Sequence, residues 1–318
     1  MGVTMNFGSM MSGRSIMAST LHDIAAKDER LFVLVADTGG AMKDFREEFP
    51  ARFIDVGIAE QNCVGVAAGL ALEGNVPVVS GMIPFLSMRA LEQVRTDICY
   101  QNLPVRLIGT GGGLTSGGGS THNAMEDIAL MSSLVNMTVL SVGDPLMIKD
   151  ILEMSMDYPG PMFIRMAQGR ADAVIYEEGT VKFEIGKAIV ANEGDDATIF
   201  CHGTMLRLSL ELARDLKEEG INVRVVDMYS IKPLDKDTVI KCVKETKRVL
   251  CWEDHLMYGG LASAVADAMA DAGVYPEVFK RMGIPQVYAG FGSGPEQQVK
   301  YSYDIDSAKK VVRAMVGK

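Results

Sequence analysis

One glutamate stands at the start of a helix that is otherwise built from small and apolar residues. It is Glu60, within the stretch RFIDVGIAEQNCVGVAAGLALEGN, and the pattern predicts a strand ending at Val56, a turn at Gly57 and a helix from Ala59. A helix with Val, Ala, Gly and Leu all round is expected to be buried together with its first turn. A buried carboxylate needs a partner or a proton, which suits it to sharing a proton with a ring nitrogen. An ordinary first-turn Glu, favoured by the helix dipole, is the alternative.

A histidine, His122, follows the glycine-rich stretch GTGGGLTSGGGST. The stretch lies between a predicted strand and a predicted helix. Glycine-rich segments can be flexible filler, and an isolated histidine in a loop is usually an ordinary surface residue. Such a loop can also bring its backbone close to a ligand, because glycine has no side chain in the way. His122 is therefore a second candidate site residue.

Both candidates depend on a sheet that positions them. Short apolar runs predict buried parallel strands at 31–36, 76–80, 105–108, 138–142, 162–166, 198–201, 223–227 and 249–252. Helical patterns occupy 15–28, 59–72, 88–101, 126–134, 145–158, 205–219, 235–246 and 260–272. The repeated β/α alternation predicts two doubly wound α/β domains. Apolar periodicity lapses over 168–180, so we place the domains at 1–175 and 176–318.

Composition excludes several classes of protein. The chain has 318 residues, with 31 Lys and Arg against 41 Asp and Glu, and a formal charge of −10. A surface this acidic argues against a nucleic-acid or anionic-membrane partner. No run is long and apolar enough to span a bilayer. The five cysteines are scattered without a C-x-x-C pair, which argues against a disulfide framework and favours a reducing, cytoplasmic compartment.

Several familiar catalytic motifs are missing from the sequence. It contains no G-x-G-x-x-G after a strand, no phosphate-binding G-x-x-x-x-G-K-[ST] loop and no G-x-S-x-G elbow. The four histidines are too dispersed to define a metal site by their spacing. We therefore expect no metal ligands in this chain.

An ordered set of motifs resembles the transketolase family. The stretches DVGIAEQ, GMIPFLSMRALEQVR and STHNAMED are similar to the pyrimidine-binding half of transketolases and of deoxyxylulose-phosphate synthases. Further on, VRVVDMYSIKPLD and CWEDHLMYGGLASAVADAM are similar to the C-terminal domain of these enzymes. The resemblance implies an enzyme that uses thiamine diphosphate, built from a pyrimidine-binding domain and a transketolase C-terminal domain.

The resemblance also implies a cofactor-binding side of the site. Glu60 matches the family glutamate that hydrogen-bonds a ring nitrogen of the cofactor's aminopyrimidine, where a shared proton favours the tautomer that activates the thiazolium carbon. Phe85 matches the aromatic residue stacked on that ring, with an ordinary core Phe as the alternative. Asp37, which closes the strand LFVLVAD, matches an acidic position beside the cofactor pocket. The carboxyl ends of parallel strands are where such sheets bind ligands.

The substrate side is implied in the same way. Arg89 and Arg165 match arginines that face the sugar-phosphate end of the substrate, a task suited to a guanidinium fork. The alternatives are a solvated helix face for Arg89 and a strand-end ion pair for Arg165. His122 matches the histidine that hydrogen-bonds substrate hydroxyl and carbonyl oxygens, and so joins Glu60 as a catalytic candidate.

The glycine-rich stretch departs from the family pattern. Transketolases usually read G-E-D-G-x-T-H here, and Gly118 replaces the aspartate that would contact a substrate hydroxyl. Thr110 stands where the family has a histidine that touches phosphate. Because lost hydrogen-bonding groups redirect selectivity, we expect an unusual ketose, branched or with a different anionic end.

The motif that binds the cofactor's diphosphate is missing as well. Full transketolases carry it as G-D-G with a later Asn, and neither Gly143-Asp144-Pro145 nor Gly194-Asp195-Asp196 matches. The chain therefore resembles the C-terminal subunit of a split transketolase. We expect an N-terminal partner subunit that provides Mg²⁺, an α₂β₂ assembly, and no activity of this chain alone.

Two other interpretations stay open. The β subunit of a thiamine-dependent 2-oxo acid dehydrogenase shares both domains and the equivalent glutamate, although the T-H-x-x-x-E-D run matches transketolases better. A non-catalytic scaffold that keeps the fold is the other interpretation. Gly118 and Thr110 favour the scaffold, whereas Glu60, Phe85 and His122 argue against it.

Overall fold

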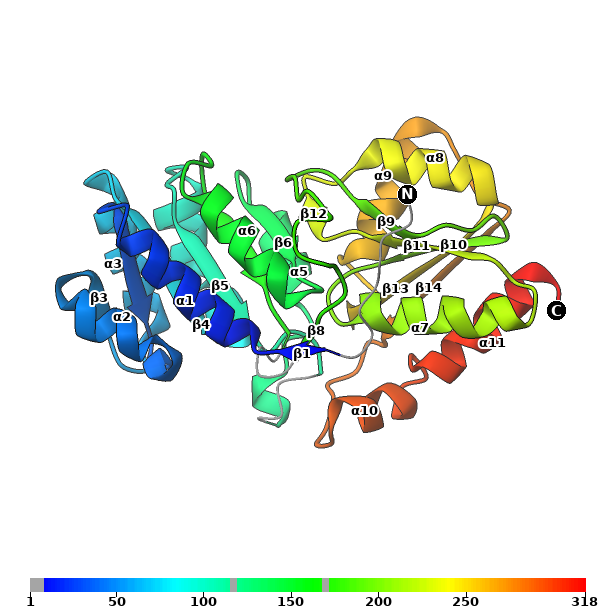
Figure 1. Cartoon of the computed structure of the whole chain (residues 1–318), viewed down its shortest axis with the longest axis horizontal. Helices are drawn as coiled ribbons and strands as arrows, with labels where there is room; N and C mark the ends of the chain where they lie inside the picture. Colours follow the sequence, from blue (N-terminus) through cyan, green and yellow to red (C-terminus); the bar gives the residue numbers. More distant parts are fainter. Residues whose placement is uncertain (1–8, 115–118, 168–171) are drawn as a thin grey trace.

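The chain forms two α/β domains that lie side by side (Figure 1). The computed structural model describes residues 9–114, 119–167 and 172–318. The first domain is built on a seven-stranded sheet of order β12-β6-β7-β5-β4-β2-β3. Its strands are β2 (Leu31–Val35), β3 (Phe53–Asp55), β4 (Val76–Met82), β5 (Arg106–Thr110), β6 (Thr138–Ser141), β7 (Met162–Arg165) and β12 (Ser230–Lys232). All neighbours are parallel except β12, which pairs antiparallel with β6.

The second domain has a five-stranded sheet of order β14-β13-β10-β11-β9. Its strands are β9 (Ile189–Asn192), β10 (Ala197–Cys201), β11 (Val223–Asp227), β13 (Arg248–Leu256) and β14 (Val278–Ile284). Only β9 runs antiparallel to its neighbour. A short ribbon of β1 (Met10–Met11) and β8 (Asp172–Ala173) lies near the junction of the domains.

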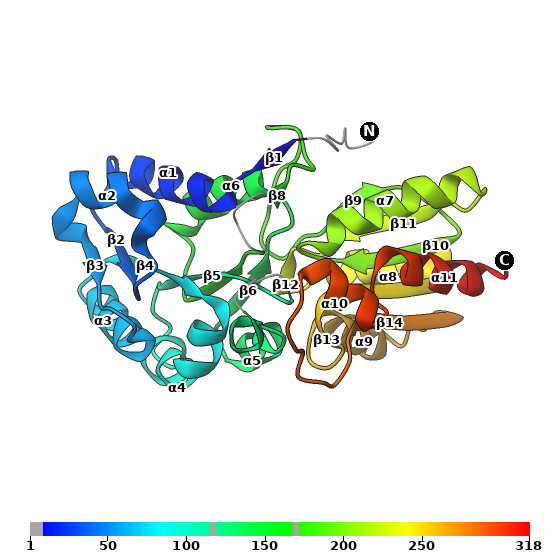
Figure 2. The same ribbon diagram turned by 90° about the horizontal axis from the view of Figure 1, so that it is seen from below.

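Helices cover both faces of each sheet, which explains why the strands are continuous apolar runs. Figure 2 shows α1 (Gly13–Ala25), α2 (Lys43–Glu48) and α6 (Pro145–Ser155) on one face of the first sheet, and α3 (Glu60–Leu72), α4 (Leu91–Gln93) and α5 (Asp127–Ser133) on the other. In the second domain, α8 (Lys236–Thr246) and α9 (Leu261–Ala272) lie opposite α7 (Met205–Glu218) and α11 (Ile305–Val316), and α10 (Gly294–Lys300) precedes α11. The predicted fold class, two doubly wound α/β domains, is confirmed.

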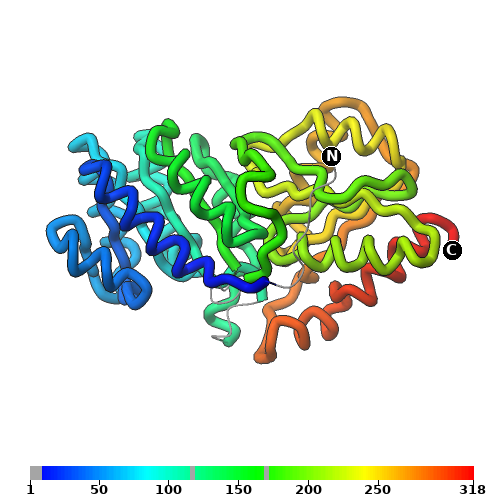
Figure 3. Tube along the Cα trace, in the orientation of Figure 1, coloured from blue at the N-terminus to red at the C-terminus, as the bar shows by residue number. Residues whose placement is uncertain are grey.

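The path of the chain differs from a simple two-domain split at one strand (Figure 3). β12 follows β11 in the sequence but joins the edge of the first sheet, where Ser230 pairs with Leu140. The segment between β8 and β9 is fixed by Asp144, whose Oδ2 accepts the backbone N–H groups of Ile175 and Tyr176. The domain limits at residues 175 and 176 stay a prediction.

Most predicted elements are present within a few residues of their predicted limits, and one helix is different. The expected helix 88–101 begins earlier and contains two π-helical segments, Phe85–Arg89 and Val94–Cys99, around the short α4. π-Helical turns are rare and frequently mark functional sites. No helix in the described ranges is long and apolar enough to cross a membrane.

Candidate active site

Four of the predicted site residues follow four neighbouring strands of the first sheet. Asp37 comes after β2, Glu60 after β3, Phe85 after β4 and His122 after β5. Because parallel strands end at the same edge of a sheet, these connections meet at its carboxyl edge. The structure then brings some of these side chains into contact and leaves others apart.

Glu60 is the first residue of α3 and is only 3% exposed. Its carboxylate has a cationic partner: Arg89 Nη1 donates to Glu60 Oε2 over 2.6 Å. A charge-assisted bond of this length offsets part of the cost of burying the carboxylate. The expectation that Glu60 is buried is met, and its partner in the chain is an arginine that the family resemblance matches to substrate.

The π-helical segment Phe85–Arg89 brings its first and last side chains together. The guanidinium carbon of Arg89 lies 4.2 Å from the centroid of the Phe85 ring, within the range of a cation–π contact. The Arg89 side chain is 42% exposed, so this contact lies at the protein surface. A solvated helix face does not describe Arg89, because it contacts both Glu60 and Phe85.

His122 completes this group of side chains. Its ring meets the Phe85 ring edge-on, with centroids 5.2 Å apart. His122 Nδ1 lies 2.9 Å from Thr121 Oγ1, a contact that holds the imidazole from one side. We call Glu60, Phe85, Arg89 and His122 the edge cluster.

Asp37 lies beside the edge cluster without joining it. Its side chain is exposed, its backbone has a φ of +55°, and its N–H donates to Asp55 Oδ1 over 3.1 Å. The same oxygen accepts the N–H of Gly57 over 3.0 Å. Asp55 therefore ties the end of β2 to the turn that precedes Glu60, and the role of Asp37 toward a cofactor stays a prediction.

Arg165 is placed differently from Arg89. It is 3% exposed, and its Nε donates to Asp127 Oδ2 over 2.7 Å while its Nη2 donates to the backbone oxygen of Asp254 over 2.8 Å. Asp254 Oδ1 in turn accepts the hydroxyl of Tyr303 and the N–H of Leu114. We call Asp127, Arg165, Asp254 and Tyr303 the seam cluster, because it joins the two domains. This geometry corresponds to the strand-end ion pair, not to an arginine open to substrate.

Burial and neighbouring charges shift the pKa values of Asp254 and Arg165 in the seam cluster. Burial raises the pKa of Asp254, with the neighbouring Arg165 cation and the Tyr303 hydroxyl acting in the opposite direction. Burial alone would lower the pKa of Arg165, but the carboxylates of Asp127 and Asp254 raise it. The cluster is thus a set of mutually dependent buried charges.

Gly112 and Gly113 of the glycine-rich stretch pack against the seam cluster. A Cβ at Gly112 would lie 2.6 Å from Arg165 Cζ, and one at Gly113 would lie 1.9 Å from Asp254 Oδ2. Gly113 also has a φ of +68°. Side chains of this chain, and not a ligand, therefore require glycine at these two positions. Gly117 and Gly118 lie outside the described residues.

The Thr110 side chain, which stands where the family has a phosphate-contacting histidine, takes part in a hydrogen bond within the chain. Arg14, from the first turn of α1, donates from Nη2 to Thr110 Oγ1 over 3.1 Å. Thr110 is the last residue of β5 and is 6% exposed. Arg14 is a residue that the sequence alone did not single out, since nothing in its neighbourhood indicated its reach to another strand.

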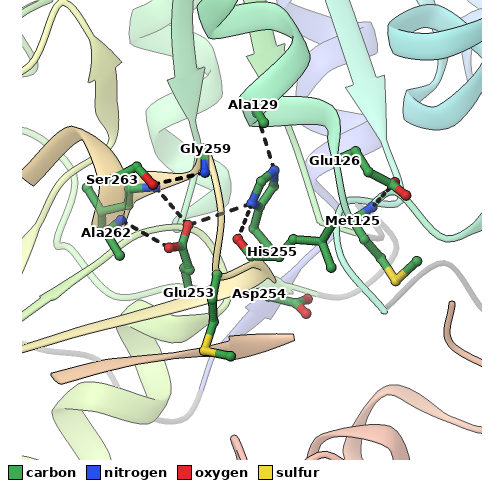
Figure 4. Close-up of polar contacts among 12 residues, drawn as sticks. Met125, Glu126, Ala129, Glu253, Asp254, His255, Gly259, Ala262 and Ser263 are labelled. Carbon is green, nitrogen blue, oxygen red and sulfur yellow. Dashed lines mark hydrogen bonds and ion pairs between the residues drawn. The ribbon is translucent and has the colours of Figure 1, made fainter. Parts of the chain in front are cut away.

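The residues around His255, in the stretch CWEDHLMYGG, form hydrogen bonds at the domain junction (Figure 4). Ala129 N–H, in the first turn of α5, points to His255 Nε2 over 3.3 Å, and Leu256 N–H donates to Met125 O. Glu253 accepts the N–H groups of Leu261 and Ala262 at the start of α9. These contacts join α5 and α9 to β13.

Two family models match the chain. One, described as "Transketolase, pyrimidine binding domain", matches residues 9–189, more than half of the chain, and the other, "Transketolase, C-terminal domain", matches residues 186–309. The chain belongs to the transketolase family.

Transketolase relatives of the same length agree with this assignment. A protein of Methanocaldococcus jannaschii named "Putative transketolase C-terminal section" is 36% identical over 300 residues, 93% of this chain and 94% of the relative. A protein of Phocaeicola vulgatus, named as one of the subunits of an "Apulose-4-phosphate transketolase", is 32% identical over 313 residues, 98% of this chain and 99% of the relative. A solved structure described as "Split gene transketolase, inactive beta4 tetramer" has a TM-score of 0.85 and 33% identity, and covers 98% of this chain and 99% of that one. The chain thus corresponds to the C-terminal subunit of a split transketolase.

Transketolases depend on thiamine diphosphate, and the edge cluster has side chains that suit its aminopyrimidine ring. A buried carboxylate such as that of Glu60 can bond a ring nitrogen, and an aromatic ring such as that of Phe85 can stack on a flat heterocycle. Within the described part of the chain, no three His, Cys, Asp or Glu side chains could hold a metal ion together.

A cavity at the domain junction is separate from the edge cluster. It has a volume of about 250 Å³ and is bordered by the starts of α6, α7 and α10 and by the ribbon of β1 and β8. None of the edge-cluster residues lines it. The edge cluster therefore lies outside this cavity.

Proposed function

We propose that this chain is the C-terminal subunit of a thiamine-diphosphate-dependent transketolase that moves a two-carbon ketol unit between sugar phosphates. The observation that carries the proposal is the edge cluster. Glu60, Phe85 and His122 follow three different strands, yet they converge at the carboxyl edge of one parallel sheet.

Three residues of the edge cluster have a role in this proposal. The bound cofactor supplies the carbanion chemistry that the protein side chains cannot. Glu60 holds a proton at the aminopyrimidine nitrogen, and Phe85 orients the ring by stacking. His122 donates to the substrate's hydroxyl or carbonyl oxygen from Nε2, because Nδ1 faces Thr121.

The remaining half of the site belongs to a partner. We propose that the cofactor's diphosphate is held through Mg²⁺ by an N-terminal subunit and that the active assembly is α₂β₂. The names of the relatives support a separate partner, since they describe a C-terminal section, a subunit, and an inactive tetramer of a split-gene transketolase. Active sites would then form only where the two kinds of subunit meet.

We further propose that the ketose is not the usual pentulose phosphate. Arg14 and Thr110 replace the expected histidine contact near β5, which changes the donor that an anionic group would meet. One relative of equal length is named for apulose-4-phosphate, which supports a substrate outside the ordinary set. Rates with xylulose 5-phosphate equal to those of an ordinary transketolase would contradict this part.

The test is Glu60→Ala in the complex reconstituted with the N-terminal subunit, thiamine diphosphate and Mg²⁺. Turnover should fall by at least about 10²-fold, because a positioned proton-sharing group contributes that much. Glu73→Ala is the matched control: it removes an exposed carboxylate at the other end of α3 and should leave turnover unchanged. Full turnover of the Glu60→Ala complex would support the non-catalytic scaffold instead.

A further inference from the structure

Arg89 makes two contacts that the proposed function assigns to the cofactor ring. Its Nη1 donates to Glu60 Oε2 over 2.6 Å, and its guanidinium carbon lies 4.2 Å from the Phe85 ring centroid. A guanidinium is flat and delocalised, carries its N–H donors in its plane, and stacks on aromatic faces. An aminopyrimidine ring that bonds the same carboxylate and stacks on the same phenyl ring offers the same two interactions.

We propose that Arg89 occupies the aminopyrimidine position in the chain without cofactor, and that it leaves Glu60 and Phe85 when the cofactor binds. This inference rests on the proposed function. It makes Arg89 a positioning residue of the free chain: it keeps the buried Glu60 carboxylate paired until the cofactor ring replaces it.

The exposure of the two partners supports such an exchange. The Glu60 side chain is 4% exposed, whereas the Arg89 side chain is 42% exposed and belongs to the last residue of its π-helical segment. A long side chain with its head at the surface can turn into solvent at little cost, while the carboxylate stays in place. Arg89 is therefore the member of the pair that can move.

The displaced guanidinium has a second use. Because its head lies at the surface, it turns to the solvent side of the edge cluster, to which His122 also belongs. Guanidinium groups bind phosphate or other anionic groups through paired N–H donors. Arg89 would then meet the anionic end of the ketose only after the cofactor is bound, which joins the two expectations for this residue into one sequence of events.

The test compares Arg89→Ala with Arg95→Ala in the reconstituted complex. Arg95 is an exposed cation in the next π-helical segment, so the two variants change the charge equally. Thiamine diphosphate affinity, measured by calorimetry with Mg²⁺ present, should become about tenfold tighter for Arg89→Ala, because a competing charged hydrogen bond and cation–π contact are gone. Arg95→Ala should stay within about twofold of the unmodified complex.

A second measurement covers the case in which Arg89→Ala weakens folding. The melting temperature of the free chain should fall for both Arg89→Ala and Arg89→Met, and the difference from the unmodified chain should vanish in the complex saturated with thiamine diphosphate. A residue with a merely structural role would lower the melting temperature in both states.

The outcomes separate this inference from the proposed function. Weaker or unchanged cofactor affinity of Arg89→Ala, with Glu60-dependent turnover intact, overturns the Arg89 exchange alone. If the unmodified complex does not bind thiamine diphosphate, both the exchange and the proposed function are overturned. At saturating cofactor, the KM of Arg89→Ala for a phosphorylated ketose should rise about tenfold, and an unchanged KM contradicts the second use of the guanidinium.

Discussion

Arg89 and Arg165 make a close comparison within one sheet. Both lie at or beyond the carboxyl ends of parallel strands, and each pairs with a carboxylate, over 2.6 Å in one case and 2.7 Å in the other. Arg89 is 42% exposed and pairs with the buried Glu60 carboxylate, whereas Arg165 is 3% exposed and lies between Asp127 and Asp254. The same residue type at the same kind of position therefore forms an open pair in one place and a closed joint in the other.

The two arginines differ in exposure because the second domain packs against Arg165 and not against Arg89. Asp254 and Tyr303 belong to the second domain and cover the end of β7, while no element of that domain contacts Glu60 or Arg89 among the interactions of the described residues. An open pair can exchange its partner for a ligand, but a closed pair cannot without separating the domains. We therefore expect mutations in the edge cluster to affect activity and mutations in the seam cluster to affect stability.

The largest effect should come from removing the cation of the seam. Arg165→Met leaves the Asp127 carboxylate and the Asp254 backbone oxygen buried without their donor, so the free energy of unfolding should fall by about 3–5 kcal/mol. Arg89→Met should lower it less, by about 1–3 kcal/mol, because it leaves one buried carboxylate without its donor while the Arg89 head itself is exposed. Urea unfolding of the two variants measures both values, and equal losses would remove the distinction between the clusters.

A buried carboxylate of the second domain, Asp227, should make the stability of the chain depend on pH. Burial raises the pKa of Asp227 to about 7 from an ordinary 3.8, although the Tyr176 hydroxyl bonded to it acts in the opposite direction. Between these values the folded chain keeps a proton that the unfolded chain has lost, so this carboxyl makes stability fall as pH rises from about 4 to 7.

Asp227→Asn removes that titration and keeps an oxygen for Tyr176. Relative to the variant, the unmodified chain should lose stability with a slope on the order of 1 kcal/mol per pH unit between about pH 5 and 7. Denaturation midpoints of both chains across this range provide the measurement. Parallel curves would show that Asp227 titrates alike in the folded and unfolded chains.

A smaller effect should distinguish two glycines with the same backbone conformation. Gly57 and Gly113 both have a φ of +68°, but a Cβ at Gly57 meets nothing within 4 Å, and one at Gly113 would lie 1.9 Å from Asp254 Oδ2. Alanine costs the same backbone strain at both sites. Gly113→Ala should therefore be about 2 kcal/mol more destabilising than Gly57→Ala in urea unfolding. Equal losses would mean that the Asp254 side chain can shift at little cost to accommodate the extra methyl group.

The sequence predicted the strands well because buried parallel strands are continuous apolar runs, as in β2 and β10. Within the two main sheets it did not predict β9, β12 or β14, which all lie at sheet edges. β12 has only three residues, Ser-Ile-Lys, and pairs with a strand of the other domain, and β14 has the exposed charged residues Lys280 and Arg281 in its middle. A local sequence pattern therefore does not predict a strand that forms through contacts between distant segments.

The same reason applies to the site. Glu60, Phe85 and His122 could be singled out by residue type and family resemblance, and the structure brings them to one edge. That Arg89 pairs with Glu60, and that Arg165 is closed in by Asp254, depends on which segments meet in space. The glycines at 112 and 113 carried a visible signal, but only the packed domains show what they accommodate.

The central claim is that the edge cluster is half of an active site that a second chain completes. The direct measurement is turnover of a ketose phosphate and an aldose phosphate, with thiamine diphosphate and Mg²⁺, by the free chain and by the chain mixed with the N-terminal subunit. We predict no turnover by the free chain, turnover by the mixture, and its loss in Glu60→Ala. Turnover by the free chain would contradict the account.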